Sequence, residues 1–355
     1  MLRKERCFFV FIVVALTMSA FLMKSNINQK SIVKSKNSVP FNPDIFVVTI
    51  NNYSKSSDHS DQKKLSESSF DRRKTYPWKD DPSCQHFAVQ MAKRNSLPKW
   101  ALTSFPGSGV TWTRQMIEGL TGIYTGSVHV RDPLPYREDN EKNMGITDNP
   151  FCGCTLIDKD HEATEGIFEK KQYLELLHGK EYSKIINVTY NYRGVLLLRN
   201  PMDVVFAHQN HLLVGKFNTA PTEAFRGPEW DELVETVAYA WADHAIHWIE
   251  QIKQGTVIFY ENLLGDNAQL ELERLLDAMD FQPRPVDANR MRCTLAHRDK
   301  SEYKRSNKTR LSLEKNHRVK LMKSINLVQH SLRKRNWPLL PVHLYDKHWS
   351  VGEYS

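Results

Sequence analysis

One short segment has the residue types of an anion-binding loop. Residues 103–114 read TSFPGSGVTWTR, in which an apolar run leads into a Pro-Gly-Ser-Gly turn at 106–109 and a helical pattern follows. Such a turn points backbone N–H groups into the positive end of a helix dipole, and its glycines let the backbone approach an anion closely. The hydroxyls of Ser108 and Thr111 add donors. The segment therefore predicts a site for a phosphate-like group.

Two common nucleotide-binding loops fit this segment less well. A P-loop NTPase needs Lys and then Ser or Thr after its last glycine, whereas Gly109 is followed by Val110 and Thr111. The G-x-G-x-x-G pattern of dinucleotide-binding domains is not completed either. A plain connection between a strand and a helix is the remaining alternative.

A second basic position follows an apolar run. Residues 194–199 read GVLLLR, and a helical pattern begins at about Met202. An Arg at the carboxyl end of a buried strand lies where α/β proteins bind ligands, and its guanidinium fork fits a phosphate. Arg199 is therefore a candidate phosphate ligand. A structural ion pair with Asp203 is the alternative.

The elements around these two positions indicate the fold class. Short apolar runs that read as strands alternate with helical patterns, with no internal repeat, so residues 80–355 are predicted to form one domain. Continuous apolar strands between helices are typical of a parallel sheet covered on both faces, so we expect an α/β protein with three layers. The strands are predicted at 100–105, 194–199 and 256–260, and the helices at 111–120, from about 202, at 232–254 and at 270–279.

The N-terminal residues have the pattern of a membrane anchor. Residues 1–6 are rich in Arg and Lys, and residues 7–23 carry no charge. At about 1.5 Å per residue this apolar run spans roughly 25 Å, enough for a thin membrane. We predict a cytosolic tail (1–6), an uncleaved transmembrane helix (7–23), a flexible luminal stem (24–79) and therefore a type II topology. A cleaved signal peptide is the alternative.

Composition and cysteine usage limit the partners. The net charge of +8 is spread along the 355 residues, which suits an anionic ligand or a membrane surface rather than nucleic acid. The sequence does not indicate an oligomeric state. Outside the apolar run, four cysteines could form two disulfides in any of three pairings; zinc is a weaker reading, because Cys152-Gly-Cys154 has an unusual ligand spacing. These cysteines are Cys84, Cys152, Cys154 and Cys293, and N-glycosylation sequons lie at Asn52, Asn187 and Asn307.

The two candidate segments together resemble a known family. Residues 105–112 (FPGSGVTW) look like the 5′-phosphosulfate loop of sulfotransferases, usually PKSGTTW, and residues 196–208 (LLLRNPMDVVFAH) resemble the family's 3′-phosphate segment. The string SFPGSGVTWTRQMIEGLTGIYTGS is most similar to the WSC-domain-containing sulfotransferases of the Golgi, although no Cys-rich WSC module is visible. The resemblance covers only the catalytic domain. It implies the P-loop-like sulfotransferase fold and the co-substrate 3′-phosphoadenosine 5′-phosphosulfate (PAPS), without a metal.

The resemblance also implies which residues bind the nucleotide. Trp112 would stack on adenine, or else simply pack in the first helical turn. Gly107 departs from many sulfotransferases, which have a Lys there, although the WSC-domain-containing group also has Gly; Ala207 replaces a family Ser. The implied ligands are Gly107, Ser108, Gly109, Val110, Thr111 and Trp112 for the 5′ side, Arg199 for the 3′-phosphate, Tyr260 of a Tyr-Glu-Asn string for adenine, and Lys304 with Arg305 for closing over the 3′-phosphate unless they form a solvated loop.

By the same resemblance, a His between the two segments acts as general base. The best match is the string IDKDHE at 157–162, in which His161 would take the acceptor's proton and Lys159 would neutralise the sulfuryl oxygens. The flanking carboxylates also suit an ordinary loop, and His129 is the next candidate. The helical pairs His208/His211 and His244/His247 are read as packing residues, because a metal site needs a third ligand.

The combined prediction is a Golgi type II membrane sulfotransferase that sulfates a hydroxyl of a glycan or glycoconjugate. One alternative is a non-catalytic nucleotide- or glycan-binding protein of the same fold, which the departures at Gly107 and Ala207 favour. Another is a phosphotransferase that uses ATP, which the missing P-loop Lys disfavours.

Overall fold

The computed structural model describes residues 74–128, 152–161, 189–215, 218–299 and 311–345. The chain divides into two compact units, Met1–Lys55 and Ser56–Ser355, and every described residue belongs to the second unit. Among the described residues no helix is long and apolar enough to cross a bilayer. The anchor predicted at 7–23 and most of the predicted stem lie outside the described residues.

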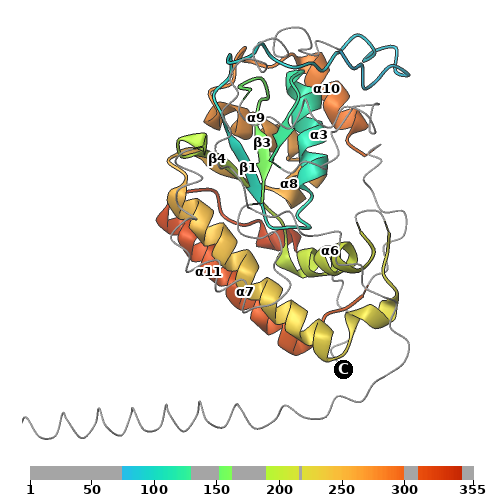
Figure 1. Cartoon of the computed structure of the whole chain (residues 1–355), viewed down its shortest axis with the longest axis vertical. Helices are drawn as coiled ribbons and strands as arrows, with labels where there is room; N and C mark the ends of the chain where they lie inside the picture. Colours follow the sequence, from blue (N-terminus) through green and yellow to red (C-terminus); the bar gives the residue numbers. More distant parts are fainter. Residues whose placement is uncertain (1–73, 129–151, 162–188, 216–217, 300–310, 346–355) are drawn as a thin grey trace, which may run out of the picture. The chain divides into compact units, whose positions relative to one another are not determined.

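A parallel five-stranded sheet forms the centre of this unit (Figure 1). Its order is β2-β3-β1-β4-β5, with every neighbouring pair parallel. β1 and β4 are short, largely apolar and mostly buried, as strands of a covered parallel sheet are, whereas β3 is buried although its residues are Asp-Lys-Asp. The strands are β1 (Ala101–Ser104), β2 (Gly126–Ser127), β3 (Asp158–Asp160), β4 (Arg193–Leu198) and β5 (Gln254–Phe259).

Helices cover the two faces of the sheet in separate layers. On one face, strand residues such as Leu102 and Val195 share a core with α3, α9 and α10; on the other, Leu196 and Phe259 share a core with α6, α7 and α11. Side chains of alternate strand residues point to opposite faces, which produces the two cores. The helices are α3 (Val110–Thr121), α6 (Pro201–Val214), α7 (Pro228–Gln251), α8 (Tyr260–Leu264), α9 (Ala268–Ala278), α10 (Ala288–His297) and α11 (Lys315–Lys334), with short 3₁₀ turns η2 (Thr222–Phe225) and η3 (Val342–Leu344).

The predicted α/β class and three-layer arrangement are confirmed. The three predicted strands correspond to β1, β4 and β5, and the predicted helices correspond to α3, α6, α7 and α9, with ends that differ by a few residues. The strands β2 and β3 and the helices α8, α10 and α11 are additional. β2 and β3 span two and three residues, which is too short for a period-2 pattern to be visible.

Two disulfides select one of the three cysteine pairings. Cys84 bonds to Cys293 across a sequence separation of 209, and Cys152 bonds to Cys154 across a separation of 2. The first bridge ties the segment before β1 to α10. Trp78, at the end of the predicted stem, packs with Phe87 and this bridge in a small buried cluster.

Candidate anion-binding and active site

The predicted site residues gather at one edge of the sheet. Because the strands are parallel and in register, their carboxyl ends lie together: Ser104 is opposite Leu197, and Leu198 is opposite Phe259. Arg199 directly follows β4 and Tyr260 directly follows β5. The chain leaves β1 toward β2 on one side and returns to β4 on the other, which makes this edge the topological switch point where α/β sheets bind ligands.

The loop after β1 depends on two glycines. Gly107 and Gly109 have φ of +90° and +89°, a region that residues with a Cβ rarely adopt. A Cβ on Gly109 would lie 2.5 Å from a ring carbon of Tyr260. A Cβ on Gly107 would lie 3.2 Å from the Ala207 Cβ and 3.2 Å from the backbone nitrogen of His208, both in α6. The turn therefore lies close to two neighbouring elements, and a side chain at Gly107 or Gly109 would require α6 or Tyr260 to move.

Unpaired donors line this loop. Ser104 Oγ, Ser108 Oγ and Arg199 Nε are buried and have no hydrogen-bond partner among the described residues. Helix α3 begins at the N-cap Gly109 with no side-chain cap and no acidic residue in its first turn. Buried donors without partners cost free energy unless a ligand or water satisfies them. The donor set and the helix N-terminus together suit an anion.

Arg199 is held against the loop rather than against Asp203. Its Nη1 donates to the Gly107 carbonyl at 2.9 Å, and its guanidinium carbon lies 4.5 Å from the centre of the Tyr260 ring. This carbonyl and this ring fix the side chain, while Nε stays unpaired. A fixed guanidinium with a spare donor is well suited to a phosphate oxygen.

Two aromatic rings form the wall beside the loop. Trp112 and Tyr260 meet edge to face with centroids 5.2 Å apart, and Trp112 Nε1 donates to the Arg298 carbonyl at 2.8 Å. Trp112 is only 7% exposed and belongs to the core beneath α3. These contacts show a packing role for Trp112; stacking on adenine stays a prediction.

His161 lies where a base would be needed. It directly follows β3, is buried, and its Nδ1 lies 2.7 Å from the carbonyl oxygen of Ser104 at the end of β1. A carbonyl only accepts, so Nδ1 carries the proton and Nε2 is the basic nitrogen of the neutral ring. Lys159 is buried two residues earlier, opposite Leu102 of β1. Strand alternation places Lys159 and the position of His161 on one side of β3.

The two described carboxylates before His161, Asp158 and Asp160, are not those of a solvated loop, and Glu162 lies outside the described residues. Asp158 accepts from Thr155 Oγ1 at 2.7 Å, and Asp160 accepts from Tyr190 Oη at 2.9 Å. Both are buried in β3. Burial raises the pKa of Asp158 to about 6, against the Thr155 hydrogen bond and the charge of Arg114, which lower it. Arg114 itself donates to Thr125 Oγ1 at 2.8 Å.

Sequence reasoning missed Glu261, the residue after Tyr260. Its Oε1 accepts from the Asn200 N–H at 2.8 Å, while Oε2 is buried without a partner among the described residues. Burial raises the pKa of Glu261 to about 7, although the Asn200 N–H and the charge of Arg199 lower it. The Tyr-Glu-Asn string marks the position, but nothing local reveals its burial.

The buried histidines are consistent with packing. Burial lowers the pKa of His208 to about 4 and that of His244 to about 3, so both rings are neutral at pH 7. His208 lies against the Phe105 ring at 5.4 Å, and His244 Nε2 lies 3.0 Å from Thr103 Oγ1. In the described part of the chain these rings are not part of a group of three metal-type ligands.

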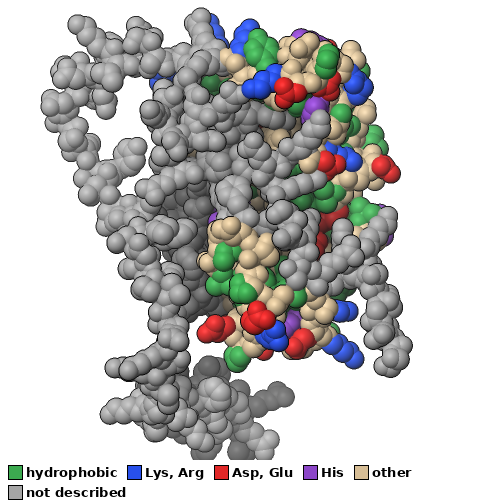
Figure 2. Space-filling model, turned by 90° about the vertical axis from the view of Figure 1, so that its right-hand side faces the viewer, with side chains coloured by type: hydrophobic (Ala, Val, Ile, Leu, Met, Phe, Trp, Pro, Cys, Tyr) green, Lys and Arg blue, Asp and Glu red, His purple; other side chains and the backbone are tan. Residues whose placement is uncertain are grey.

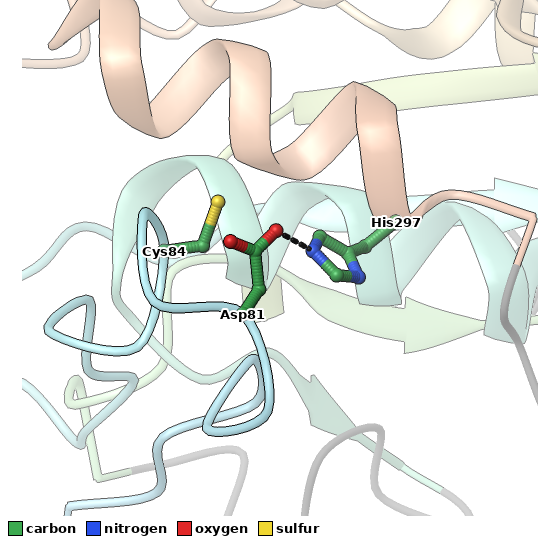
Figure 3. A group of neighbouring side chains, drawn as sticks. All are labelled: Asp81, Cys84 and His297. Carbon is green, nitrogen blue, oxygen red and sulfur yellow. Dashed lines mark hydrogen bonds and ion pairs between the residues drawn. The ribbon is translucent and has the colours of Figure 1, made fainter.

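One other cluster has metal-type ligands, and its cysteine is already bonded. Asp81, Cys84 and His297 lie close together, and His297 Nε2 contacts Asp81 Oδ2 at 2.9 Å (Figure 3). Hydrogen bonds from Ser83 and then from His297 lower the pKa of Asp81 to about 2. Because the Cys84 sulfur is in the bridge to Cys293, only two ligands remain, too few for a protein zinc site.

Some predicted residues cannot be placed. His129, Lys304, Arg305 and the three sequons lie outside the described residues. On the described part of the face in Figure 2, acidic and basic side chains are intermixed, so the net positive charge does not gather into one patch there.

Comparison with known proteins identifies relatives of this arrangement. WSCD family members of Drosophila pseudoobscura pseudoobscura and Drosophila melanogaster are 26% identical over 204 residues and 27% identical over 214 residues. The chain resembles the WSCD family. This confirms the resemblance seen in the string after β1. The matches cover 56% and 59% of this chain but only 55% and 58% of those relatives, so the chain spans little more than half of their length.

Two further comparisons concern protein families and solved structures. No protein-family model matches the chain. Mouse sulfotransferase SULT7A1 complexed with PAP (3′-phosphoadenosine 5′-phosphate) aligns over 74% of this chain and 87% of that chain, with 17% identity and a TM-score of 0.36. That overlap is too poor to support a conclusion, so the fold assignment depends on the strand order and pairing alone.

Proposed function

We propose that the chain is a sulfotransferase that uses PAPS. One observation carries the proposal: three features lie at the same edge of the sheet. They are a glycine loop with buried donors that have no partner among the described residues, an Arg199 held in place, and a His161 whose basic nitrogen is Nε2. The similarity to the WSCD family and the ordered pair of sulfotransferase-like segments support the same activity. The donors present fit a phosphosulfate, because they are oriented N–H, hydroxyl and guanidinium groups.

Each residue has a defined task in this proposal. Ser108, Gly109 and the first turn of α3 hold the 5′-phosphosulfate, and Arg199 holds the 3′-phosphate. When bound, PAPS supplies an activated sulfuryl group. His161 Nε2 takes the proton of the acceptor hydroxyl, while Nδ1 keeps its bond to Ser104. Lys159 is assigned to the developing charge on the sulfuryl oxygens.

The proposed acceptor and location follow from the N-terminal part of the sequence. The N-terminal anchor pattern supports a single-pass type II protein of the Golgi membrane with its catalytic domain in the lumen. Glycan hydroxyls are abundant acceptors in that compartment. We therefore propose a glycan or glycoconjugate hydroxyl as the acceptor.

A ligand-induced thermal shift of the full-length chain tests the nucleotide assignment. PAP at about 100 times its dissociation constant should stabilise the chain by about 2.7 kcal/mol, and ATP should shift it much less. Arg199→Ala should lose the PAP shift, because the loop then lacks its guanidinium. Arg193→Ala is the matched control: Arg193 lies at the other end of β4, bonded to Gln254 at 3.2 Å, and its loss should leave the PAP shift intact.

Transfer assays with labelled donors separate the enzyme classes. A sulfotransferase should move label from radiolabelled PAPS to a glycan pool and none from γ-labelled ATP. A larger response to ATP in both experiments would overturn the proposal in favour of a kinase.

A non-catalytic nucleotide-binding protein is the second candidate, and Gly107 favours it. The family-typical Lys is absent, and the contact with α6 leaves no room for a side chain at this position. The two candidates differ in one result: the binding protein should show the PAP shift and no transfer with any acceptor.

A further inference from the structure

Four unpaired buried atoms lie beside the proposed nucleotide site. They belong to Arg199 (Nε), Asn200 (Nδ2), Glu261 (Oε2) and Tyr345 (Oη), and none has a hydrogen-bond partner among the described residues. Asn200 and Glu261 are joined directly through the 2.8 Å bond from the Asn200 N–H. The charge of Arg199 acts on Glu261, and that of Glu261 acts on Tyr345. The side chains of Arg199, Glu261 and Tyr345, together with the Asn200 N–H, therefore form one electrostatic group.

Glu261 is the group whose charge can change near neutral pH. Glu261 is only 6% exposed, and this burial is the main reason that its pKa is raised to about 7. Asp203 of α6 raises this pKa further, while Arg199 lowers it. Tyr345, just after η3, stays a neutral phenol, because burial, Glu261 and Asp203 hold its pKa well above the ordinary value of 10.0.

Among the described residues, the other charged groups named around α8 have partners other than Glu261. On α9, Glu271 and Arg274 form an ion pair at 2.5 Å. After α10, Arg298 donates to the carbonyl of Gly265 at 2.9 Å. Arg199 is therefore the cation whose charge acts directly on Glu261 within the described residues.

We propose that Glu261 is a positioning residue: an anion binds more tightly at Arg199 when the Glu261 carboxyl takes up one proton. This inference rests on the proposed function, in which Arg199 holds a phosphate of the nucleotide. Ionised Glu261 attracts the guanidinium and repels an incoming phosphate. Protonated Glu261 does neither, and its Oε1 can still accept the Asn200 N–H.

The proton balance of the step is simple. The bound phosphate adds negative charge next to a buried carboxylate, which raises the affinity of that carboxylate for protons. Glu261 therefore takes one proton from solvent as the nucleotide binds and returns it on release. By linkage, the nucleotide must bind more weakly as pH rises and Glu261 ionises.

Binding calorimetry of PAP to the full-length chain tests this coupling. Wild type and Glu261→Gln are compared at about pH 6 and about pH 8.5, on either side of the carboxyl's titration. We expect equal affinities at the lower pH and about tenfold tighter binding by Glu261→Gln at the higher pH, which corresponds to a coupling of about one pKa unit. The phosphates of PAP also titrate near pH 6, but they do so equally with both proteins. The ratio of the two dissociation constants at each pH therefore removes their effect.

Asp266→Asn is the matched control, and proton uptake is the second readout. Asp266 is an exposed carboxylate just beyond α8, so this variant loses the same charge without changing the buried group, and its pH profile should follow wild type. In buffers of different ionisation enthalpy, wild type should take up more protons per PAP than Glu261→Gln at neutral pH.

The outcomes separate this inference from the proposed function. If wild type and Glu261→Gln bind PAP with the same pH profile and the same proton uptake, the coupling is wrong and the proposed function stands. If the folded wild-type chain binds no PAP at any pH, both fall. Should Glu261→Gln fail to fold, the infrared band of a protonated carboxyl decides: it should grow when PAP is added to wild type at about pH 8, and no growth overturns the coupling.

Discussion

At the residue scale, two side chains carry the proposed chemistry and one position limits it. His161 has its tautomer set by the Ser104 carbonyl, and Arg199 is fixed by the Gly107 carbonyl and the Tyr260 ring. Gly107 cannot carry the Lys of many sulfotransferases without moving α6. Any compensating charge at the sulfuryl group must therefore come from another element, and Lys159 of β3 is the proposed source.

Replacing His161 should remove transfer and spare nucleotide binding. We expect His161→Ala to lower the turnover number by about 10²- to 10⁴-fold, the usual loss for a general base. The thermal shift with PAP should be unchanged, because His161 is assigned to the acceptor. His330→Ala, on the exposed side of α11, is the control and should retain both properties. Full turnover in His161→Ala would exclude it as the base.

Restoring the family Lys should destabilise the chain without raising activity. At φ +90° a residue with a Cβ is strained by about 1–2 kcal/mol, and the Gly107 Cβ would also press on α6 at 3.2 Å. Chemical denaturation of Gly107→Lys should show a loss of about 1–3 kcal/mol.

Gly227→Lys separates the two causes of that loss. Gly227 has φ of +88° and open space around its Cβ position, so its variant carries the backbone strain alone. A loss for Gly107→Lys no larger than that for Gly227→Lys would mean that α6 does not constrain the loop.

At the element scale, the site depends on four parallel strands that end at one edge and on helices that begin there. α3 starts at the loop, α6 starts after Arg199 and α8 starts at Tyr260. The N-termini of the two longer helices, α3 and α6, add partial positive charge where the anion would bind. The segment before β1 is held to α10 by a covalent bridge, so this arrangement is also stabilised from behind the sheet.

The two disulfides should contribute very differently to stability. The Cys84–Cys293 bridge closes a loop with a separation of 209 residues, so its removal as Cys84→Ser with Cys293→Ser should cost about 2–5 kcal/mol. The Cys152–Cys154 bridge has a separation of 2 residues, so the matched double Ser variant should cost less than about 2 kcal/mol. Thermal unfolding of both variants checks the order, and the reverse order would contradict the loop-entropy argument.

At the scale of the whole molecule, the polar groups near the sheet edge are buried without full compensation. Two carboxyls, Asp158 and Glu261, have a raised pKa, and two imidazoles, His208 and His244, have a lowered pKa, in each case mainly because of burial. Such groups reduce stability in exchange for defined charge states at the site. The two carboxyls should therefore cost stability as pH rises from about 4 to about 7, and the two imidazoles as pH falls below about 6.5.

Acid should destabilise the chain partly through His244. Its pKa falls from 6.5 to about 3 on folding, so below about pH 6.5 only the unfolded chain takes up this proton, and stability is lost as pH falls toward 3. His244→Asn should keep the contact with Thr103 and reduce the loss between about pH 6.5 and 4 by about 3 kcal/mol. Urea titrations at both pH values, with the exposed His330→Asn as control, check this. Equal losses in wild type and His244→Asn would show that His244 is not buried neutral.

The sequence by itself determined the features that depend on neighbouring residues. The glycine turn before α3, the apolar strands β1, β4 and β5 and the basic residue after β4 are all visible within windows of about 15 residues, because propensity and periodicity act locally. The α/β class and the WSCD resemblance follow from the order of those segments. Arg199 is a candidate because it follows an apolar run, whereas His161 and Tyr260 are candidates through the sulfotransferase resemblance.

Tertiary structure alone decided which of these residues act together. The register of β1, β3, β4 and β5 brings His161, Arg199 and Tyr260 to one edge, although His161 and Tyr260 are 260 − 161 = 99 positions apart in the sequence. The exclusion of a side chain at Gly107, the cysteine pairing and the raised pKa of Glu261 likewise depend on distant neighbours. Desolvation and close contact are properties of the packed environment, so no local pattern encodes them.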